Sequence, residues 1–174
     1  MDKKDLVDQL KKCGAIQYGH FVLTSGAVSD YYVDIKKAST TPSVLKTIAS
    51  SMEPVAKQGY DVIAGMELGA VPLIVALSLQ TGIPFVIVRK QKRDHGTGKQ
   101  IEGISVKDKK VLIIEDVTTS GGSVVNTIQI LRQHHALLDT VITVVDRESG
   151  ARKKIENLQL RFLPLVTVQD ILEE

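Results

Sequence analysis

Residues 111–123 read Val-Leu-Ile-Ile-Glu-Asp-Val-Thr-Thr-Ser-Gly-Gly-Ser, and the character of the chain changes within them. The run Val111–Glu115 is apolar and rich in β-branched residues without polar alternation, which is typical of a strand buried on both faces. A segment with helical periodicity, Gly121–His134, follows a short polar turn. A buried strand, a glycine-containing turn and a helix in this order indicate one repeating unit of a parallel sheet.

The same alternation continues on both sides of this unit. Strands are predicted at 61–65, 84–88 and 140–145, and a helix at 70–80. Another helix is predicted to start at Thr41-Pro42, with the hydroxyl as cap, and to end by Gly59. The pattern predicts an α/β fold with a central, mostly parallel sheet flanked by helices. Ligands of such sheets bind at the carboxyl ends of strands, near a topological switch point.

The N-terminal part has a different rhythm. A helix over 5–13, stopped by Gly14, precedes two short predicted strands at 20–24 and 31–35 around the turn-prone Ser25-Gly26. No repeat, low-complexity tract or linker divides the chain. We therefore interpret 1–174 as a single domain.

Composition narrows the class of protein. The chain has 174 residues, of which 43% are hydrophobic and 24% charged, as in a globular domain. Lys+Arg at 22 against Asp+Glu at 20 argue against a protein that binds nucleic acid. The single cysteine excludes an internal disulfide and fits a reducing compartment. The longest apolar stretch, 68–79, is too short for a membrane span, and no signal peptide is visible. We expect a cytoplasmic protein with no membrane or nucleic-acid partner.

The turn after Val111–Glu115 has the chemistry of a phosphate site. Glycines allow backbone N–H groups to surround an anion, and the following helix adds its positive N-terminal end. The two carboxylates before it, Glu115 and Asp116, are acceptors that suit the vicinal hydroxyls of a ribose. An ordinary strand–helix turn, in which these residues only cap the helix, is the alternative. Four side chains there can each donate a hydrogen bond: Thr118, Thr119, Ser120 and Ser123.

This segment resembles the motif by which type I phosphoribosyltransferases bind 5-phosphoribosyl-1-diphosphate (PRPP). The resemblance implies that Glu115 and Asp116 hold the ribose hydroxyls, that 118–123 holds the 5′-phosphate, and that Asp116 is catalytic. The implied PRPP-binding residues here are Glu115, Asp116, Val117, Thr118, Thr119, Ser120, Gly121, Gly122 and Ser123.

A second segment, Arg89–Gly103, carries five basic side chains, one histidine and three glycines. Its charge suits a polyanion such as pyrophosphate, although a solvated charged loop would have the same composition. The order Arg-Lys-x-x-Arg-Asp-His-Gly-x-Gly resembles the mobile catalytic loop of orotate phosphoribosyltransferases. The resemblance implies a homodimer in which this loop, 89–103, closes over the partner's site.

The same resemblance implies that Arg89, Lys90, Arg93 and His95 contact the diphosphate. Many family members have lysine where Arg93 stands, and arginine cannot act as an acid near neutral pH. If that lysine protonates the leaving oxygen, Lys92 or His95 has to substitute. The implied catalytic residues are therefore Asp116, Lys92, Arg93 and His95.

Three further segments match orotate phosphoribosyltransferases. Phe21–Asp34 is similar to a stretch that helps cover the base, which implies a small hood made of about 1–36 and the C-terminal segment. Gly65–Pro72 looks like the diphosphate loop, or else is a plain tight turn. The segment 146–150 matches Asp-Arg-x-x-x-Gly, which implies that Arg147, with Thr119, binds orotate; a salt bridge from Arg147 to its neighbour Glu148 is the alternative.

The resemblance implies transfer of phosphoribose from PRPP to orotate, giving orotidine 5′-phosphate and pyrophosphate, a step of pyrimidine synthesis. It implies Mg²⁺ bound through PRPP, with no direct protein ligand expected. Two alternatives remain open. One is a type I transferase for another nucleobase, and the other is a non-catalytic PRPP-sensing regulator, which would be expected to carry an added DNA-binding module.

Overall fold

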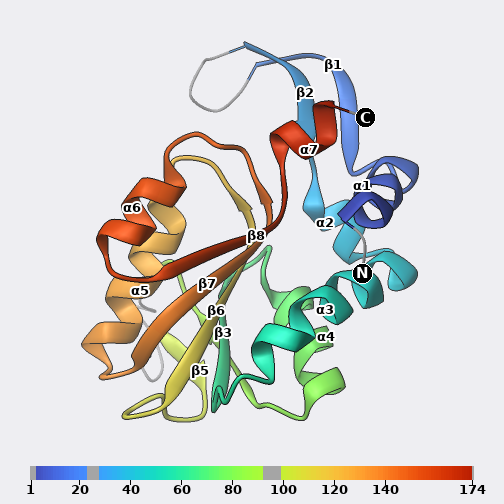
Figure 1. Cartoon of the computed structure of the whole chain (residues 1–174). Coiled ribbons are helices and arrows are strands. Elements are labelled where there is room, and N and C mark those ends of the chain that lie inside the picture. The colour runs from blue at the N-terminus through green and yellow to red at the C-terminus, as the bar shows by residue number, and fades with distance from the viewer. Residues whose placement is uncertain (1–2, 23–27, 92–98, 174) are drawn as a thin grey trace.

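The chain folds around a six-stranded sheet, seen in a computed structural model that describes residues 3–22, 28–91 and 99–173 (Figure 1). The strand order is β5-β4-β3-β6-β7-β8, and neighbours are parallel except for β5, which runs antiparallel to β4. The predicted mostly parallel sheet is confirmed. The strands are β3 (Val62–Met66), β4 (Phe85–Val88), β5 (Ile101–Gly103), β6 (Lys110–Thr118), β7 (Leu137–Asp146) and β8 (Arg161–Thr167).

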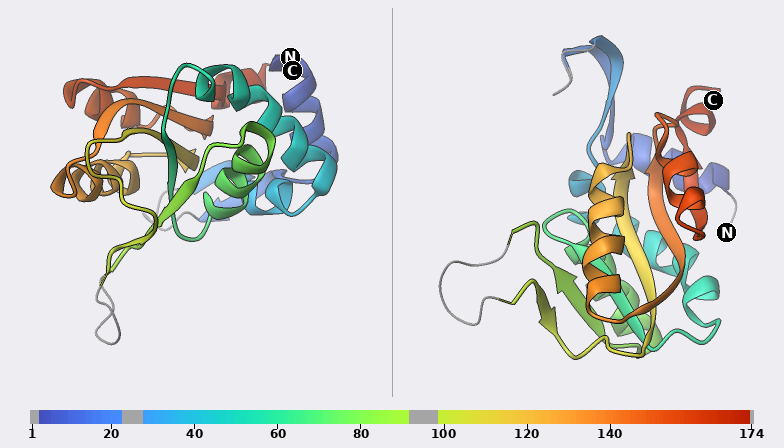
Figure 2. Two further views of the ribbon diagram at one scale, coloured as in Figure 1. Left: turned by 90° about the horizontal axis from the view of Figure 1, so that it is seen from below. Right: turned by 90° about the vertical axis from the view of Figure 1, so that its left-hand side faces the viewer.

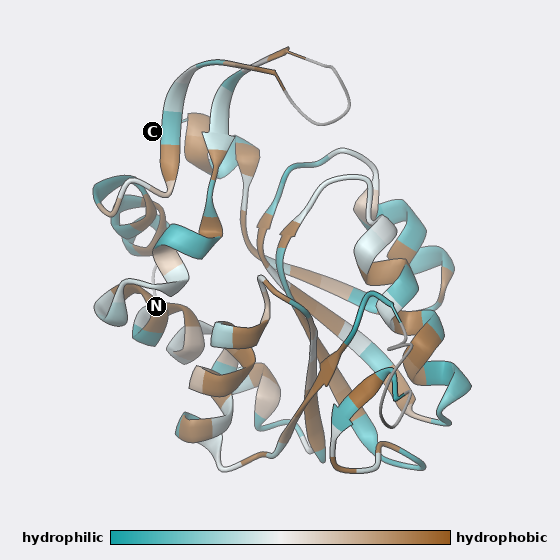
Figure 3. Ribbon diagram, turned by 180° about the vertical axis from the view of Figure 1, so that it is seen from behind, coloured by the Kyte–Doolittle hydropathy of each residue, from teal (hydrophilic) through white to brown (hydrophobic). Residues whose placement is uncertain are grey.

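Helices cover both faces of the sheet, because successive residues of a strand point to opposite sides. In β6, Val111 and Ile113 pack toward α5 and α6, whereas Leu112 and Ile114 pack into the cluster of α1, α3 and α4. Figure 2 shows α5 lying across one face, and Figure 3 shows the mainly hydrophobic colour of the central strands. The helices are α1 (Lys3–Lys12), α2 (Ile35–Ser39), α3 (Pro42–Ala56), α4 (Val71–Thr81), α5 (Gly122–Gln133), α6 (Ala151–Asn157) and α7 (Val168–Leu172).

Several boundaries differ from the expectation. β6 continues to Thr118 instead of ending at Glu115, so the two carboxylates lie inside the strand. Helix α3 begins at Pro42 as predicted, but Thr41 is not a side-chain cap, because its hydroxyl donates to Lys37 O at 3.0 Å. Ile35 opens helix α2 and does not end a strand.

A separate two-stranded antiparallel sheet, β1 (Ile16–Val22) and β2 (Val28–Val33), lies beyond one end of the main sheet (Figure 1). Helices α1 and α7 lie on the same side, and Lys3 Nζ joins them through an ion pair of 3.1 Å to Asp170. The N- and C-terminal segments thus meet beside the hairpin. Among the described residues, no helix has the length and apolar character needed to cross a bilayer.

The strand order reverses between β3 and β6. From β3 the chain crosses through α4 to β4 on one side, and from β6 it crosses through α5 to β7 on the other. Such a switch point leaves a crevice between two loops that diverge to opposite faces. The loops that flank it are Gly65–Pro72 and Val117–Ser123, both singled out by the sequence.

Candidate active site

The expected site loops meet at the carboxyl edge of the sheet. The segments after β3, β4, β6 and β7 all emerge there, because these strands are parallel. The end of β3 contacts the first turn of α5, which follows the loop after β6, since Ser123 Oγ lies 3.3 Å from Met66 Sδ. The loops after β6 and β7 are joined by a hydrogen bond from Arg147 N to Thr118 O at 2.9 Å. Segments separated by up to 80 residues thus form one site.

The two carboxylates near the end of β6 point to opposite sides of the strand. Glu115 continues the α5-facing row of Val111 and Ile113, and it is only 5% exposed. Its Oε2 accepts a hydrogen bond from Ser123 Oγ at 3.1 Å, and its Oε1 accepts one from Asp116 N at 3.2 Å. Asp116 follows on the opposite row and is half-buried. The acid pair is therefore divided between a buried and an accessible carboxylate.

The pKa of Glu115 is raised to about 8, and burial is the largest cause. The side-chain hydrogen bond and the negative charge of Asp116 act in the same direction, and the hydrogen bonds from Asp116 N and Ser123 only partly oppose them. Removing a carboxylate from water disfavours its charged form, and a neighbouring like charge acts in the same direction. Burial thus favours the protonated form of the Glu115 carboxyl.

Gly69 leaves the space that the Asp116 carboxylate occupies. A Cβ at residue 69 would lie 2.0 Å from Asp116 Oδ2 and 2.4 Å from its Cγ, closer than any real contact. Only glycine fits there while the Asp116 side chain keeps this position. The loop after β3 and the accessible acid of β6 are thus packed directly against each other.

The four hydroxyl groups of this segment have two kinds of surroundings: two of them bind protein groups, and two are exposed. The sequence indicates that four of them can donate to a ligand, and two of these donate to protein groups in the structure. Thr118, only 2% exposed, donates to Asp146 Oδ1 at 3.0 Å, and Ser123 donates to Glu115. Thr119 and Ser120 are exposed. Thr118 is buried because β6 extends to this residue, whereas Ser123 lies in the first turn of α5.

Gly121 turns the chain from β6 into α5. Its φ is +78°, a left-handed conformation that favours glycine, and a Cβ there would lie 3.0 Å from Ala151 Cα. Gly122 and the exposed Ser123 then form the first turn of a helix of 12 residues. The N–H groups of this turn have no partners within the helix, and the helix dipole is positive here, so the turn can hold a phosphate.

Arg147 lies directly after β7, at the level of Thr118. Its guanidinium carbon stands 5.1 Å from the centre of the Tyr31 ring, which belongs to β2 of the hairpin. This contact places an aromatic face and a forked cation together, which suits a flat, negatively charged ligand. Tyr31 was singled out only as part of Phe21–Asp34. Thr119, the other expected base contact, follows Thr118 at the start of the adjacent loop.

The basic loop, residues 89–103, begins beside the loop after β3. Arg89 and Lys90 follow β4, and the Lys90 N–H donates to Glu67 Oε1 at 3.1 Å. Glu67 was not predicted as a site residue, and an acidic residue between apolar ones and glycine gave no sequence signal for this contact. The remaining residues expected to be catalytic in this loop, Lys92, Arg93 and His95, lie outside the described residues.

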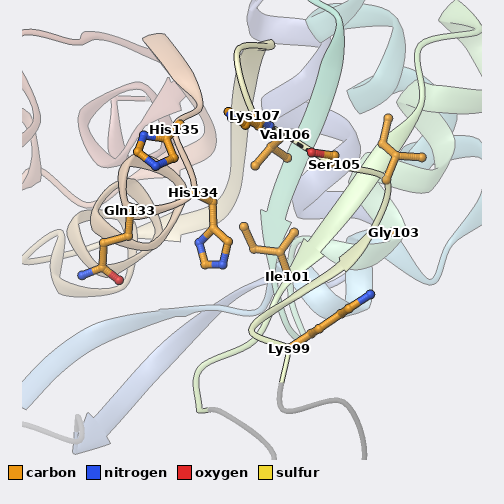
Figure 4. A pocket seen from close by; sticks show the side chains of 10 residues that line it. Lys99, Ile101, Gly103, Ser105, Val106, Lys107, Gln133, His134 and His135 are labelled. Atoms are coloured by element: carbon orange, nitrogen blue, oxygen red, sulfur yellow. Dashed lines mark hydrogen bonds between the residues drawn. The ribbon is translucent and has the colours of Figure 1, made fainter.

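A hollow of about 440 Å³ lies away from this site, between β5 and the end of α5 (Figure 4). His134 and His135 line it, with Lys99 and Lys107. His134 Nδ1 lies 2.8 Å from Ile130 O, which ties the ring to its own helix. In the described part of the chain, no group of three or more His, Cys, Asp or Glu side chains could hold a metal ion.

Comparison with known proteins agrees with this geometry. Residues 40–160 match the phosphoribosyl transferase domain model. The orotate phosphoribosyltransferase of Pyrococcus horikoshii is 50% identical over 172 residues, which cover 97% of this chain and 92% of that protein.

Solved structures give the same result. The orotate phosphoribosyltransferase of Aeropyrum pernix superposes with a TM-score of 0.88 at 31% identity, covering 97% of this chain and 96% of that one. The Mycobacterium tuberculosis enzyme in complex with PRPP superposes with a TM-score of 0.82 at 28% identity, covering 98% and 99%. The chain therefore belongs to the phosphoribosyl transferase family and, within it, to the orotate phosphoribosyltransferases.

Proposed function

We propose that this protein transfers the 5-phosphoribosyl group of PRPP to orotate, forming orotidine 5′-phosphate and pyrophosphate in pyrimidine nucleotide synthesis. The observation that carries the proposal is the meeting, at one switch point, of Asp116, the turn at Gly121 and Arg147. An acceptor for ribose hydroxyls, a phosphate cradle and a cation for a carboxylate are the three contacts that this pair of substrates requires. The orotate phosphoribosyltransferase relatives support the same activity.

In this proposal the chain positions its substrates and needs no nucleophile. The 5′-phosphate lies on the first turn of α5, the ribose hydroxyls face Asp116, and the orotate carboxylate faces Arg147. Orotate nitrogen attacks the anomeric carbon while the bond to pyrophosphate breaks, so positive charge develops on the ribose ring. A correctly oriented pair of reactants accounts for much of such a rate enhancement, and exclusion of water protects the oxocarbenium-like centre.

Glu115 has a separate part in this arrangement. Its buried carboxyl binds Ser123 of the first turn of α5, so it positions the phosphate cradle relative to β6. Asp116 provides the accessible negative charge near the ribose, where it stabilises the positive charge that develops in the transition state.

We propose that Mg²⁺ enters as part of the substrate, as a PRPP complex. The donor set suits this arrangement, because Glu115 is buried and accepts a hydrogen bond from Ser123, which leaves Asp116 as the accessible carboxylate of the pair. Mg²⁺ prefers several hard oxygen ligands and retains water, and the phosphates of a substrate can supply the missing ligands.

The proposal extends to the rest of the molecule. Residues of about 1–36 with the C-terminal segment form a hood over the site, supported by the contact of Tyr31 with Arg147. The protein acts as a cytoplasmic homodimer whose 89–103 loop, with Arg89, Lys90, Lys92, Arg93 and His95, serves the partner's site. Arg147 distinguishes orotate from bases that lack a carboxylate.

Product formation from PRPP, Mg²⁺ and orotate, followed by chromatography, tests the activity. Uracil, adenine, guanine and hypoxanthine run in parallel, and Asp116→Asn is the control variant. Orotidine 5′-phosphate from the wild-type protein, with a strongly reduced rate in the variant, is the expected result. Product from another base only would overturn the assignment of Arg147. PRPP binding without product from any base would favour a PRPP-sensing regulator.

A further inference from the structure

Glu67 links the loop after β3 to the first residues of the basic loop. Its backbone N–H donates to Val88 O at 2.9 Å, which fixes residue 67 beside the end of β4. Its side chain then contacts two successive residues: Oε1 accepts from Lys90 N at 3.1 Å, and Oε2 lies 3.7 Å from Arg89 Nη2. One carboxylate therefore sets the point from which the basic loop leaves the sheet.

Arg89 has a second carboxylate on its other side. Glu102 of β5 places Oε1 3.8 Å from Arg89 Nη1. The Arg89 N–H donates to Gln100 O at 2.9 Å, so the departing and returning strands of the loop are joined here. The guanidinium thus stands between two acids that come from different strands.

These ion pairs are of a kind that a ligand can displace. The side chains of Arg89, Glu67 and Glu102 are 24%, 32% and 39% exposed, and the closest charged atoms are 3.7 to 3.8 Å apart. Ion pairs that water can reach at such distances contribute little free energy. A diphosphate offers the same guanidinium several oxygens with more negative charge, and arginine binds such groups with two parallel hydrogen bonds.

We propose that Glu67 is a positioning residue and a temporary counter-ion, which holds Arg89 in the free protein and releases it to the diphosphate of PRPP. This inference rests on the function proposed above, because it takes the diphosphate to lie beside Arg89. Glu67 has two separable contributions: an acceptor that anchors Lys90 N, and a negative charge that competes with the substrate.

Glutamine at this position separates the two contributions. Its amide oxygen can still accept from Lys90 N, whereas its charge is gone. Glu67→Gln is therefore expected to bind PRPP and inorganic pyrophosphate about two- to five-fold more tightly, in line with the strength of an exposed ion pair. The gain should shrink as salt is added. The KM for orotate should stay within two-fold of the wild-type value.

Alanine removes both contributions. Glu67→Ala loses the anchor of Lys90 as well, so its kcat is expected to fall while its affinity for pyrophosphate stays at or above the wild-type value. Glu156→Gln on α6, where Glu156 pairs with Arg152 at 3.2 Å, has the same change in net charge and should leave PRPP binding unchanged.

Calorimetric titration with PRPP and with pyrophosphate, beside kcat and KM for both substrates, provides the test. Unchanged or weaker binding by a folded Glu67→Gln variant would overturn the inference. In proteins that also carry Arg89→Ala, Glu67→Gln should no longer increase the affinity for PRPP or pyrophosphate. An increase in affinity that persists there would refute a role through Arg89.

The two proposals can fail separately. If the wild-type protein binds PRPP but makes no orotidine 5′-phosphate, the transferase proposal fails, and the affinity ratio of Glu67→Gln still decides the counter-ion role. A wild-type protein that binds neither PRPP nor pyrophosphate would overturn both.

Discussion

The hydroxyl of Thr118 donates a hydrogen bond to Asp146 Oδ1 at 3.0 Å and joins the carboxyl ends of β6 and β7. Both side chains are buried, and the Glu148 N–H donates to the same carboxylate oxygen at 3.1 Å. Arg147 is the next residue after Asp146. This bond therefore sets the separation between the turn at Gly121, expected to hold a phosphate, and the arginine expected to bind the base. Two parts of the site are therefore positioned by one buried pair.

Thr118→Val removes the Thr118 hydroxyl as a donor to Asp146 Oδ1, for which the Glu148 N–H is then the remaining donor described. A buried acceptor that loses its partner costs about 1–3 kcal/mol, so the free energy of unfolding should fall by that amount. The KM values for both PRPP and orotate should rise together. Urea denaturation and steady-state kinetics measure these effects. Thr118→Ser, which keeps the hydroxyl, should recover most of the loss; if it behaves like valine, the hydrogen bond is not the cause.

Arg147→Lys is expected to raise the KM for orotate roughly ten-fold or more, because lysine cannot form the paired hydrogen bonds of a guanidinium and charged hydrogen bonds contribute about 1.5–3 kcal/mol. If the substitution weakens only the binding of orotate, the KM for PRPP should change by less than about two-fold. Arg132→Lys is the matched control, since Arg132 lies at the far end of α5 and donates to Leu158 O. Equal effects of the two variants on orotate would refute the assignment.

The raised pKa of Glu115 predicts that the free energy of unfolding depends on pH in an unusual way. Its pKa rises from the ordinary 4.5 to about 8 in the folded protein. Between these two values the folded state holds a proton that the unfolded state has lost. The contribution of Glu115 to the free energy of unfolding is therefore largest below about pH 4.5, falls as the pH rises through this window, and levels off above about 8.

Glu115→Gln removes this titration and keeps a similar shape. Its free energy of unfolding, relative to the wild-type protein, should increase between pH 5 and pH 8.5, as measured by urea denaturation at several pH values. Asp116→Asn removes the neighbouring charge and should move the decline of the wild-type curve to lower pH. Curves for Glu115→Gln and wild type that stay parallel over this range would contradict a raised pKa.

Gly121 and Gly122 form a matched pair for testing the turn. Gly121→Ala should lower the free energy of unfolding by more than about 1 kcal/mol, because it combines a left-handed φ with a close approach to Ala151. Gly122→Ala meets only Ser120 Oγ at 4.0 Å and should be neutral or slightly stabilising. Thermal unfolding of both variants measures the difference. Equal melting temperatures would show that the turn tolerates a side chain at residue 121.

The strands that the sequence predicted well are those whose residues form an unbroken apolar run. The strands at 61–65, 84–88 and 140–145 were found within a few residues, because β-branched runs buried on both faces leave few alternatives. Strand β8 was not predicted, since it contains Pro164 and begins with Arg161. Both features are tolerated at the edge of a sheet, where β8 lies, but they resemble a loop in sequence.

The sequence predicted which residues belong to the candidate site more fully than it predicted how they are arranged. The order of acids, hydroxyls and glycines located the loop after β6, but it did not reveal that the strand continues past Glu115 and also contains Asp116. The alternation of that strand sends one acid into the protein and leaves the other accessible. Contacts between distant segments, such as Glu67 with Lys90 and Tyr31 with Arg147, depend on strand order and carry no local signal.

The antiparallel pairing of β4 with β5 has an evolutionary consequence. Val88 faces Ile101 and Val86 faces Gly103, so the chain leaves the sheet and returns to it at the same edge. Lengthening a segment whose two ends are already held together costs little, because closure entropy grows only slowly with length. The residues between these strands can therefore be inserted, deleted or exchanged while the sheet keeps its register. Under the proposed function, selection can adapt the segment expected to contact the diphosphate independently of the loop expected to hold the ribose.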